Sequence, residues 1–155
     1  LPATLTQIGQ SAFYGCSRLS SLTLPSALAK ISANTFANCA SLSSIVLPAE
    51  LTEISTGAFS GCVKLSSLDI NGKLEKISKN SFSFCPRLSY VILSESVKEI
   101  EGNAFEKTIV YSLCAAKPSG WAETISKSDI YFYSETDPIF EGNYWHYTNG
   151  VPTSW

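Results

Sequence analysis

The sequence predicts a β-rich solenoid closed by an irregular C-terminal cap, and three features of the 155-residue chain lead to that fold class. A phenylalanine returns every 23 residues, and in four of its five copies a cysteine follows three positions later. Apolar residues fill matching positions of each copy without a gap. A unit this short cannot bury its own apolar face, so the copies must stack. The phenylalanine slot holds Phe13, Phe36, Phe59, Phe82 and Phe105.

Each unit follows the pattern LxxIxxxAFxxCxxLxxLxLP, which divides into three segments. The LxLP segment alternates apolar and polar residues and predicts a short strand. Pro25 and Pro48 end that strand because proline has no N–H for the next ladder bond. The LxxI segment predicts a second extended segment or a tight turn, and AFxxC predicts one helical or 3₁₀ turn. Strands of successive units should pair in parallel at about 4.8 Å.

The cysteine slot predicts packing rather than cross-linking or metal binding. Cys16, Cys39, Cys62 and Cys85 share one position that should face inward, where cysteine acts as a small apolar side chain. Same-slot residues of stacked units have parallel Cβ directions, which suit a disulfide poorly. A ladder also spreads ligands along a line instead of around a metal ion. We therefore expect free, buried thiols, and neither a metal site nor a cofactor.

The repeat weakens after its fifth copy, AFEKT, where Thr108 replaces the cysteine. Cys114 falls 23 residues after Val91, so residues 110–115 should form the fifth strand, with Tyr111 in the inward leucine slot. The alternation of IYFYS (residues 130–134) predicts a sixth strand in the same sheet. We divide the chain into a solenoid of five 23-residue units (residues 1–116) and a capping segment packed on the same domain (residues 117–155). Because the chain starts mid-unit, we expect a longer array.

The repeat resembles the BspA-like (Treponema-type) leucine-rich repeat family of bacterial and protist surface proteins. LTQIGQSAFYGCSRLSSLTLP (residues 5–25) and the three copies after it carry this likeness. AAKPSGW (residues 115–121), IYFYSETDP (130–138) and GNYWHYTNGVPTSW (142–155) look like the closing segments of such proteins from gut Firmicutes. The resemblance implies a right-handed leucine-rich repeat coil. It also implies an extracellular or cell-surface bacterial protein that engages host extracellular proteins or microbial surface proteins.

Several function classes lack support in the sequence. The net charge of −2 gives no electrostatic basis for binding nucleic acid or anionic lipid. No segment approaches the 18 or more apolar residues expected of a membrane span. His146 is the only histidine, and no nucleophile, phosphate-loop or metal-binding motif occurs. We therefore expect no enzymatic activity.

Binding is the favoured function, because a solenoid presents the variable outward positions of each unit as one extended surface. Tyr90 and Ile92 would be its anchors, since aromatic residues are enriched in binding hot spots. The alternative is carbohydrate binding by exposed C-terminal aromatic residues, although the same rings could instead seal the last apolar layer. A purely structural spacer would show neither feature. The outward strand residues are Ser21, Thr23, Ser44, Val46, Ser67, Asp69, Tyr90 and Ile92. The carbohydrate-binding alternative uses Tyr144, Trp145, Tyr147 and Trp155.

Overall fold

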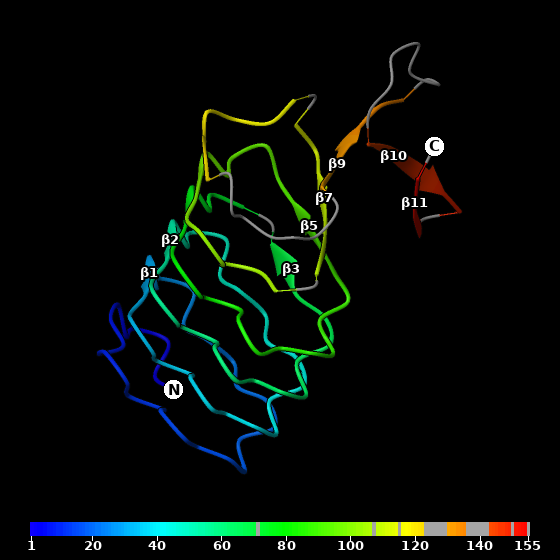
Figure 1. Ribbon diagram of the computed structural model, residues 1–155. Helices are drawn as coiled ribbons and strands as arrows, with labels where there is room; N and C mark the ends of the chain where they lie inside the picture. Colours follow the sequence, from blue (N-terminus) through cyan, green and yellow to red (C-terminus); the bar gives the residue numbers. More distant parts are fainter. Residues whose placement is uncertain are drawn as a thin grey trace.

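The chain coils into a solenoid in which two parallel sheets lie on opposite sides of a stacked core (Figure 1). The computed structural model describes residues 1–70, 72–106, 108–114, 116–122, 130–135, 143–149 and 151–154. This part of the chain has no helices. The predicted solenoid of short parallel strands is confirmed.

The first sheet forms from the LxxI segments, which are extended rather than tight turns. Its strands are β1 (Lys30–Ile31), β2 (Glu53–Ile54), β4 (Lys76–Ile77), β6 (Glu99–Ile100) and β8 (Gly120–Trp121). They lie in that order and pair in parallel. The second residue of each strand is buried and the first faces outward. At the C-terminal end, Trp121 is buried and its indole N–H donates to the Val97 carbonyl at 3.1 Å.

The second sheet forms from the LxLP segments and extends into the tail. It contains β3 (Asp69–Ile70), β5 (Tyr90–Leu93), β7 (Ile109–Ser112), β9 (Ile130–Tyr133), β10 (Tyr144–Thr148) and β11 (Val151–Ser154). Pairing is parallel from β3 to β10, and β10 and β11 form an antiparallel hairpin. The bridges Thr23↔Val46 and Ser44↔Ser67 continue the pairing into the earlier coils. Because β9 pairs with β7, the predicted sixth strand is confirmed.

A column of turns around the phenylalanine slot connects the two sheets within each coil. The Phe36 N–H donates to the Ala58 carbonyl of the next coil at 2.8 Å, whereas the Ala37 N–H donates locally to Asn34 at 3.1 Å. The prediction of a helical or 3₁₀ turn was wrong. Left-handed residues on both sides of the phenylalanine prevent a helix and turn alternate N–H groups toward the next coil. These residues have φ between 55° and 75°: Ser11, Asn34, Gly57, Asn80 and Asn103 before it, and Gly15, Asn38, Gly61 and Phe84 after it.

Stacked phenylalanine rings form the core behind these turns. Consecutive ring centroids from Phe13 to Phe105 lie 5.2–5.3 Å apart, and their planes differ by 3–13°. Parallel rings at this centroid distance are offset-stacked, an arrangement that aromatic pairs favour. Every coil therefore repeats the contact made by the coil before it.

The cysteine slot lies beside the rings and makes a repeated hydrogen bond. Cys39, Cys62 and Cys85 are buried, and all five cysteines are free. Each buried thiol donates to the carbonyl of the phenylalanine 26 residues earlier, at 3.1–3.2 Å. The inward prediction is confirmed for these three and wrong for Cys16, which is exposed in the first coil. Burial raises the pKa of the Cys85 thiol from 9.0 to about 11.

The register predicted for the fifth strand was wrong. Val91 pairs with Val110, 19 residues later, so Cys114 does not occupy the Val91 slot. The coil after Phe105 is four residues shorter, and the buried Thr108 hydroxyl donates to the Leu88 carbonyl at 2.9 Å. As a result Tyr111 pairs with Ile92 and faces outward instead of filling the inward leucine slot.

Both sheets extend past residue 116, because β8 pairs with β6 and β9 pairs with β7. The division into units 1–116 and 117–155 therefore stays a prediction about folding units. It describes where the 23-residue repeat ends, and β8 and β9 add one further coil to the same two sheets.

We expect the buried thiols to make stability sensitive to alkaline pH. The folded pKa of Cys85 exceeds its unfolded value of 9.0. Its contribution is thus complete below about pH 9 and is lost as the pH rises toward 11. Cys85→Ala should cost about 1–2 kcal/mol at neutral pH. Between neutral pH and about pH 10.5, the free energy of unfolding of the wild type should fall by about 2 kcal/mol more than that of this variant, as measured by urea unfolding. Exposed Cys16→Ala is the control; a Cys85→Ala deficit that is equal at both pH values would contradict the prediction.

Candidate binding surface

The eight strand residues predicted to bind a partner lie together on the outer side of the second sheet. We call this outer side the strand face. Its first column contains Ser21, Ser44, Ser67 and Tyr90, and its second column contains Thr23, Val46, Asp69 and Ile92. The pairs Thr23↔Val46, Ser44↔Ser67 and Asp69↔Ile92 place neighbours side by side. Val46 is 78% exposed and Tyr90 46%, whereas Ile92 is half-buried.

The first three coils of the strand face have outward side chains without partners in the described part of the chain. Ser21, Ser44 and Ser67 are exposed, and their hydroxyls make no hydrogen bond with another described residue. Asp69 is also exposed and forms no ion pair among the described residues. These groups are available to hydrogen-bond with another molecule.

The C-terminal end of the strand face is aromatic. The Tyr111 ring lies 6.0 Å from that of Tyr90 and 5.6 Å from that of Tyr131. Burial, followed by the neighbouring Tyr131 and Tyr90, raises the pKa of Tyr111. Sequence reasoning placed Tyr111 inward because it kept the 23-residue register, and it did not include Tyr131 among the strand-face residues. Placing Val110 and Ile130 in the inward row of Val91 would have turned Tyr111 and Tyr131 outward, because neighbouring strand residues face opposite sides.

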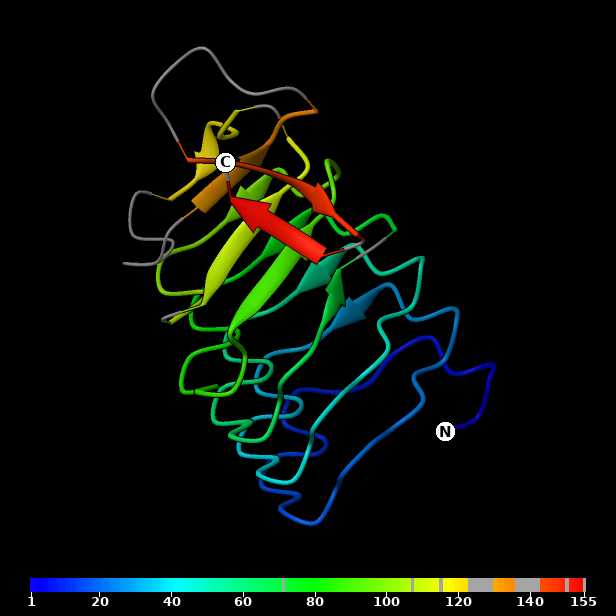
Figure 2. The ribbon, with the colours of Figure 1, turned by 90° about the vertical axis from the view of Figure 1, so that its right-hand side faces the viewer.

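The β10–β11 hairpin stands on this aromatic end. Viewed from the side, it extends away from the sheet (Figure 1), and viewed face-on, it crosses in front of the strands (Figure 2). Trp145 of β10 is fully buried, and its ring centroid lies 5.1 Å from Tyr111 and 5.3 Å from Tyr133. Its indole N–H donates to the Ser112 carbonyl at 2.9 Å. Trp145 therefore fastens the hairpin to the strand face.

The structure places the carbohydrate-binding candidates in different environments. Trp145 offers no exposed surface, and Tyr144 is half-buried. The Tyr147 side chain and Trp155 lie outside the described residues. The half-buried His146 lies 2.9 Å from the Thr148 hydroxyl through its Nε2 atom. Carbohydrate binding through this group of residues stays a prediction.

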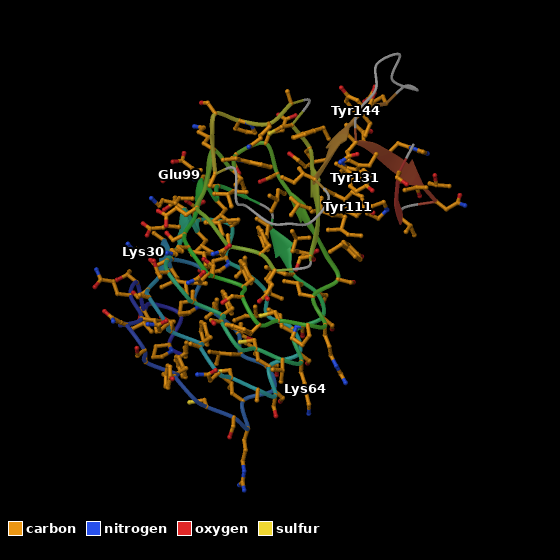
Figure 3. The ribbon with its side chains drawn as sticks, in the orientation of Figure 1. Lys30, Lys64, Glu99, Tyr111, Tyr131 and Tyr144 are labelled. Carbon is orange, nitrogen blue, oxygen red and sulfur yellow. The ribbon has the colours of Figure 1, made fainter. Side chains whose placement is uncertain are left out.

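The outer side of the first sheet is a ladder of paired charges that the sequence reasoning also missed. Its outward slot alternates Lys30, Glu53, Lys76 and Glu99 along successive strands. Lys30–Glu53 and Lys76–Glu99 are ion pairs of 2.8 Å, and Lys76 also lies 2.8 Å from Glu101. Hydrogen bonds from Lys76 and the Lys79 backbone lower the pKa of Glu101. In Figure 3, Lys30 and Glu99 lie on the opposite side of the molecule from Tyr111 and Tyr131.

Among the described residues, no three histidine, cysteine, aspartate or glutamate side chains gather closely enough to hold a metal ion.

The described residues include no helix with the length and apolar character needed to cross a membrane.

Comparison with known proteins identifies the repeat. The sequence model of the BspA type leucine-rich repeat region matches residues 1–111 in six copies, one more than the five units we counted. The chain belongs to this BspA-type family. It is similar to the crystal structure of a leucine-rich repeat protein from Treponema pallidum, with a TM-score of 0.69 and 35% identity. That match covers 72% of this chain and 56% of the Treponema chain. No curated protein matches the sequence.

The BspA-type assignment indicates a protein-interaction module. Leucine-rich repeats commonly bind proteins, because a solenoid presents a long surface made of equivalent positions. This chain spans little more than half the length of the solved Treponema protein that it matches. Among the described residues, the strand face contains outward side chains that are both varied and unpaired, such as Ser21, Ser44, Ser67 and Asp69.

We expect Trp145→Ala to release the hairpin while the coils stay folded. The change removes a buried indole and its hydrogen bond, a loss of about 3–5 kcal/mol in packing. Hydrogen–deuterium exchange should accelerate across residues 144–154 and stay unchanged in β2 and β4 (residues 53–77). Trp145→Phe keeps an aromatic ring without the indole N–H, so its exchange should be intermediate. Uniform acceleration through the whole chain would show that Trp145 supports the entire fold instead.

Proposed function

We propose that this chain is a non-enzymatic adhesion module of a bacterial cell-surface or secreted protein. It binds a host extracellular protein or a microbial surface protein through the strand face. The observation that carries this proposal is the contrast between the two sheets. The outward charges of the first sheet pair with one another, whereas Ser21, Ser44, Ser67 and Asp69 face solvent without a described partner.

The aromatic end of the strand face supplies the anchor for such a partner. Tyr90 is 46% exposed, and its neighbour Tyr111 is held by Tyr131 and Trp145. A ring already fixed by its neighbours loses little conformational entropy on binding. Tyrosine is also enriched among hot-spot residues. We therefore place the energetic centre of the interface at Tyr90 and its polar periphery on the serines of the earlier coils.

The strand face selects its partner by shape and apolar contact rather than by charge. Asp69 is the only charged residue among the eight residues of its two columns. Long-range steering between charged surfaces is therefore weak, and the association should be nearly independent of ionic strength. An extracellular location fits the BspA-type family, whose members are typically surface-associated.

The test compares two tyrosines of similar exposure on different surfaces. Tyr90 is 46% exposed on the strand face, and Tyr14 is 57% exposed on the turn column. Biosensor screening against host extracellular matrix proteins and microbial surface proteins should identify a binder. Tyr90→Ala should weaken its affinity about tenfold or more, a loss of at least about 1.4 kcal/mol, whereas Tyr14→Ala should change it less than about twofold.

Two further measurements separate binding from folding. Thermal unfolding should give similar midpoints for the wild type and both variants, because neither ring is buried. The affinity should change little between about 0.05 and 0.5 M salt. The proposal fails if no protein in the screen binds, if both tyrosine variants weaken binding equally, or if salt abolishes it.

A further inference from the structure

A second candidate binding surface lies on the column of turns around the phenylalanine slot, which we call the turn column. It lies between the two sheets and apart from the strand face. An open groove of about 640 Å³ crosses four successive coils there. At the spacing of about 4.8 Å between parallel coils, it is about 14 Å long. The lining residues include Asn34, Gly57, Asn80, Phe84, Asn103 and Glu106.

The groove exists because the third coil has small residues where its neighbours have larger ones. The left-handed slot before the phenylalanine holds Asn34, Gly57 and Asn80 in successive coils. A Cβ atom at Gly57 would lie 2.4 Å from the Asn34 side-chain oxygen, so a larger residue there would displace Asn34. Ser60 and Ser83 are hydrogen-bonded through their hydroxyls at 2.9 Å and belong to the same lining.

Phe84 borders this groove and is the one aromatic residue in its slot. The equivalent positions in the first three coils hold Gly15, Asn38 and Gly61, which suit the left-handed backbone. The fifth copy of the repeat has Lys107 at this position of the sequence. Phe84 has a φ of 56° and is 68% exposed. A large side chain in this conformation costs free energy, and a mostly exposed ring offsets little of that cost by packing. Phe84 also borders a second hollow of about 350 Å³ with Val63 and Pro86, so much of its ring is accessible.

Polar groups of the groove surround this ring and are mostly neutral. The side-chain amides of Asn80 and Asn103 make no hydrogen bond with another described residue. Among the lining residues that the structure describes, Glu106 is the only charged one, and its carboxylate accepts the Phe84 backbone N–H at 3.2 Å. None of the described lining residues is cationic, so none of them could neutralise a phosphate or another anion.

We infer that this turn-column groove binds a neutral oligosaccharide. A sugar ring has an apolar face of C–H groups and an edge of hydroxyls. Its apolar face would stack on Phe84, as aromatic rings favour such contacts with apolar surfaces. The amides of Asn80 and Asn103 would both donate to and accept from its hydroxyls, and the free oxygen of Glu106 would accept from one. The groove length fits several linked rings.

This site is independent of the protein-binding proposal and of the C-terminal aromatic residues. Phe84 lies in a turn, whereas Tyr90 lies in β5 on the strand face. A peptide would be the main competing occupant. The described lining offers a peptide a single exposed aromatic ring and no free strand edge, so it favours hydroxyl-rich ligands over an extended chain.

The test uses the whole chain on a printed array of neutral and acidic oligosaccharides, followed by calorimetric titration of the best neutral ligand. Phe84→Gly removes the ring and relieves the left-handed backbone, so its melting temperature should equal or exceed that of the wild type. Its affinity for the neutral ligand should fall at least tenfold. Asn103→Ala should weaken binding severalfold, and the matched control Tyr14→Ala should leave it unchanged.

The combination of retained or increased stability with lost binding identifies Phe84 as a ligand contact, because a structural role would lower both. The inference is overturned if no neutral oligosaccharide binds, if only acidic glycans or peptides bind, or if Phe84→Gly retains full affinity. A loss caused by Trp145→Ala but not by Phe84→Gly would assign carbohydrate binding to the C-terminal aromatic residues instead.

Discussion

Every coil of this protein must present the same side chain, at the same height, to the coil above it. The 5.2–5.3 Å ring stacking shows this constraint directly, since each phenylalanine ring stacks on the equivalent ring of the neighbouring coil. A repeated position is stable only if its side chain packs well against the equivalent side chain of the next coil. Offset aromatic rings satisfy that condition, and so do thiols that donate to the preceding coil's carbonyl. Charges of one sign do not, which explains why Lys30, Glu53, Lys76 and Glu99 alternate.

The same constraint divides the surface into faces of different character. On the first sheet, alternating charges satisfy one another and bring neighbouring coils into register. On the strand face, the serines of the first three coils do not need a partner of opposite charge in the neighbouring coil. Their slot can therefore change to Tyr90 without disturbing the coils below. A stack that is stabilised along its core and first sheet leaves its second sheet free to vary, which is the condition for binding a partner.

The sequence was sufficient to predict the positions whose residue type is set by packing against the equivalent residue of the next coil. It was insufficient to predict the other positions. The phenylalanine, leucine and cysteine positions all repeat, so the core followed directly from the pattern. Cys114 was misplaced because the segment between Phe105 and the next strand is four residues shorter than in earlier coils. A residue 23 positions after Val91 therefore no longer lies in the Val91 slot. The turns were predicted wrongly because Asn34 and Gly57 are different residue types, so the sequence did not reveal that they share a left-handed backbone conformation. The groove was invisible because it depends on side chains that are missing from one coil.

Departures from the repeat are consequently more informative than the repeat itself. When a residue matches the others in its slot, stacking between coils is enough to explain why that residue type occurs there. Phe84 has no such explanation, because its slot favours glycine or asparagine and its ring is exposed. Tyr111 differs: its departure follows from the shortened coil, and Trp145 then covers it. The ring of Tyr111 is packed against Trp145, whereas the ring of Phe84 opens onto solvent, which is why the exposed ring of Phe84 points to a ligand.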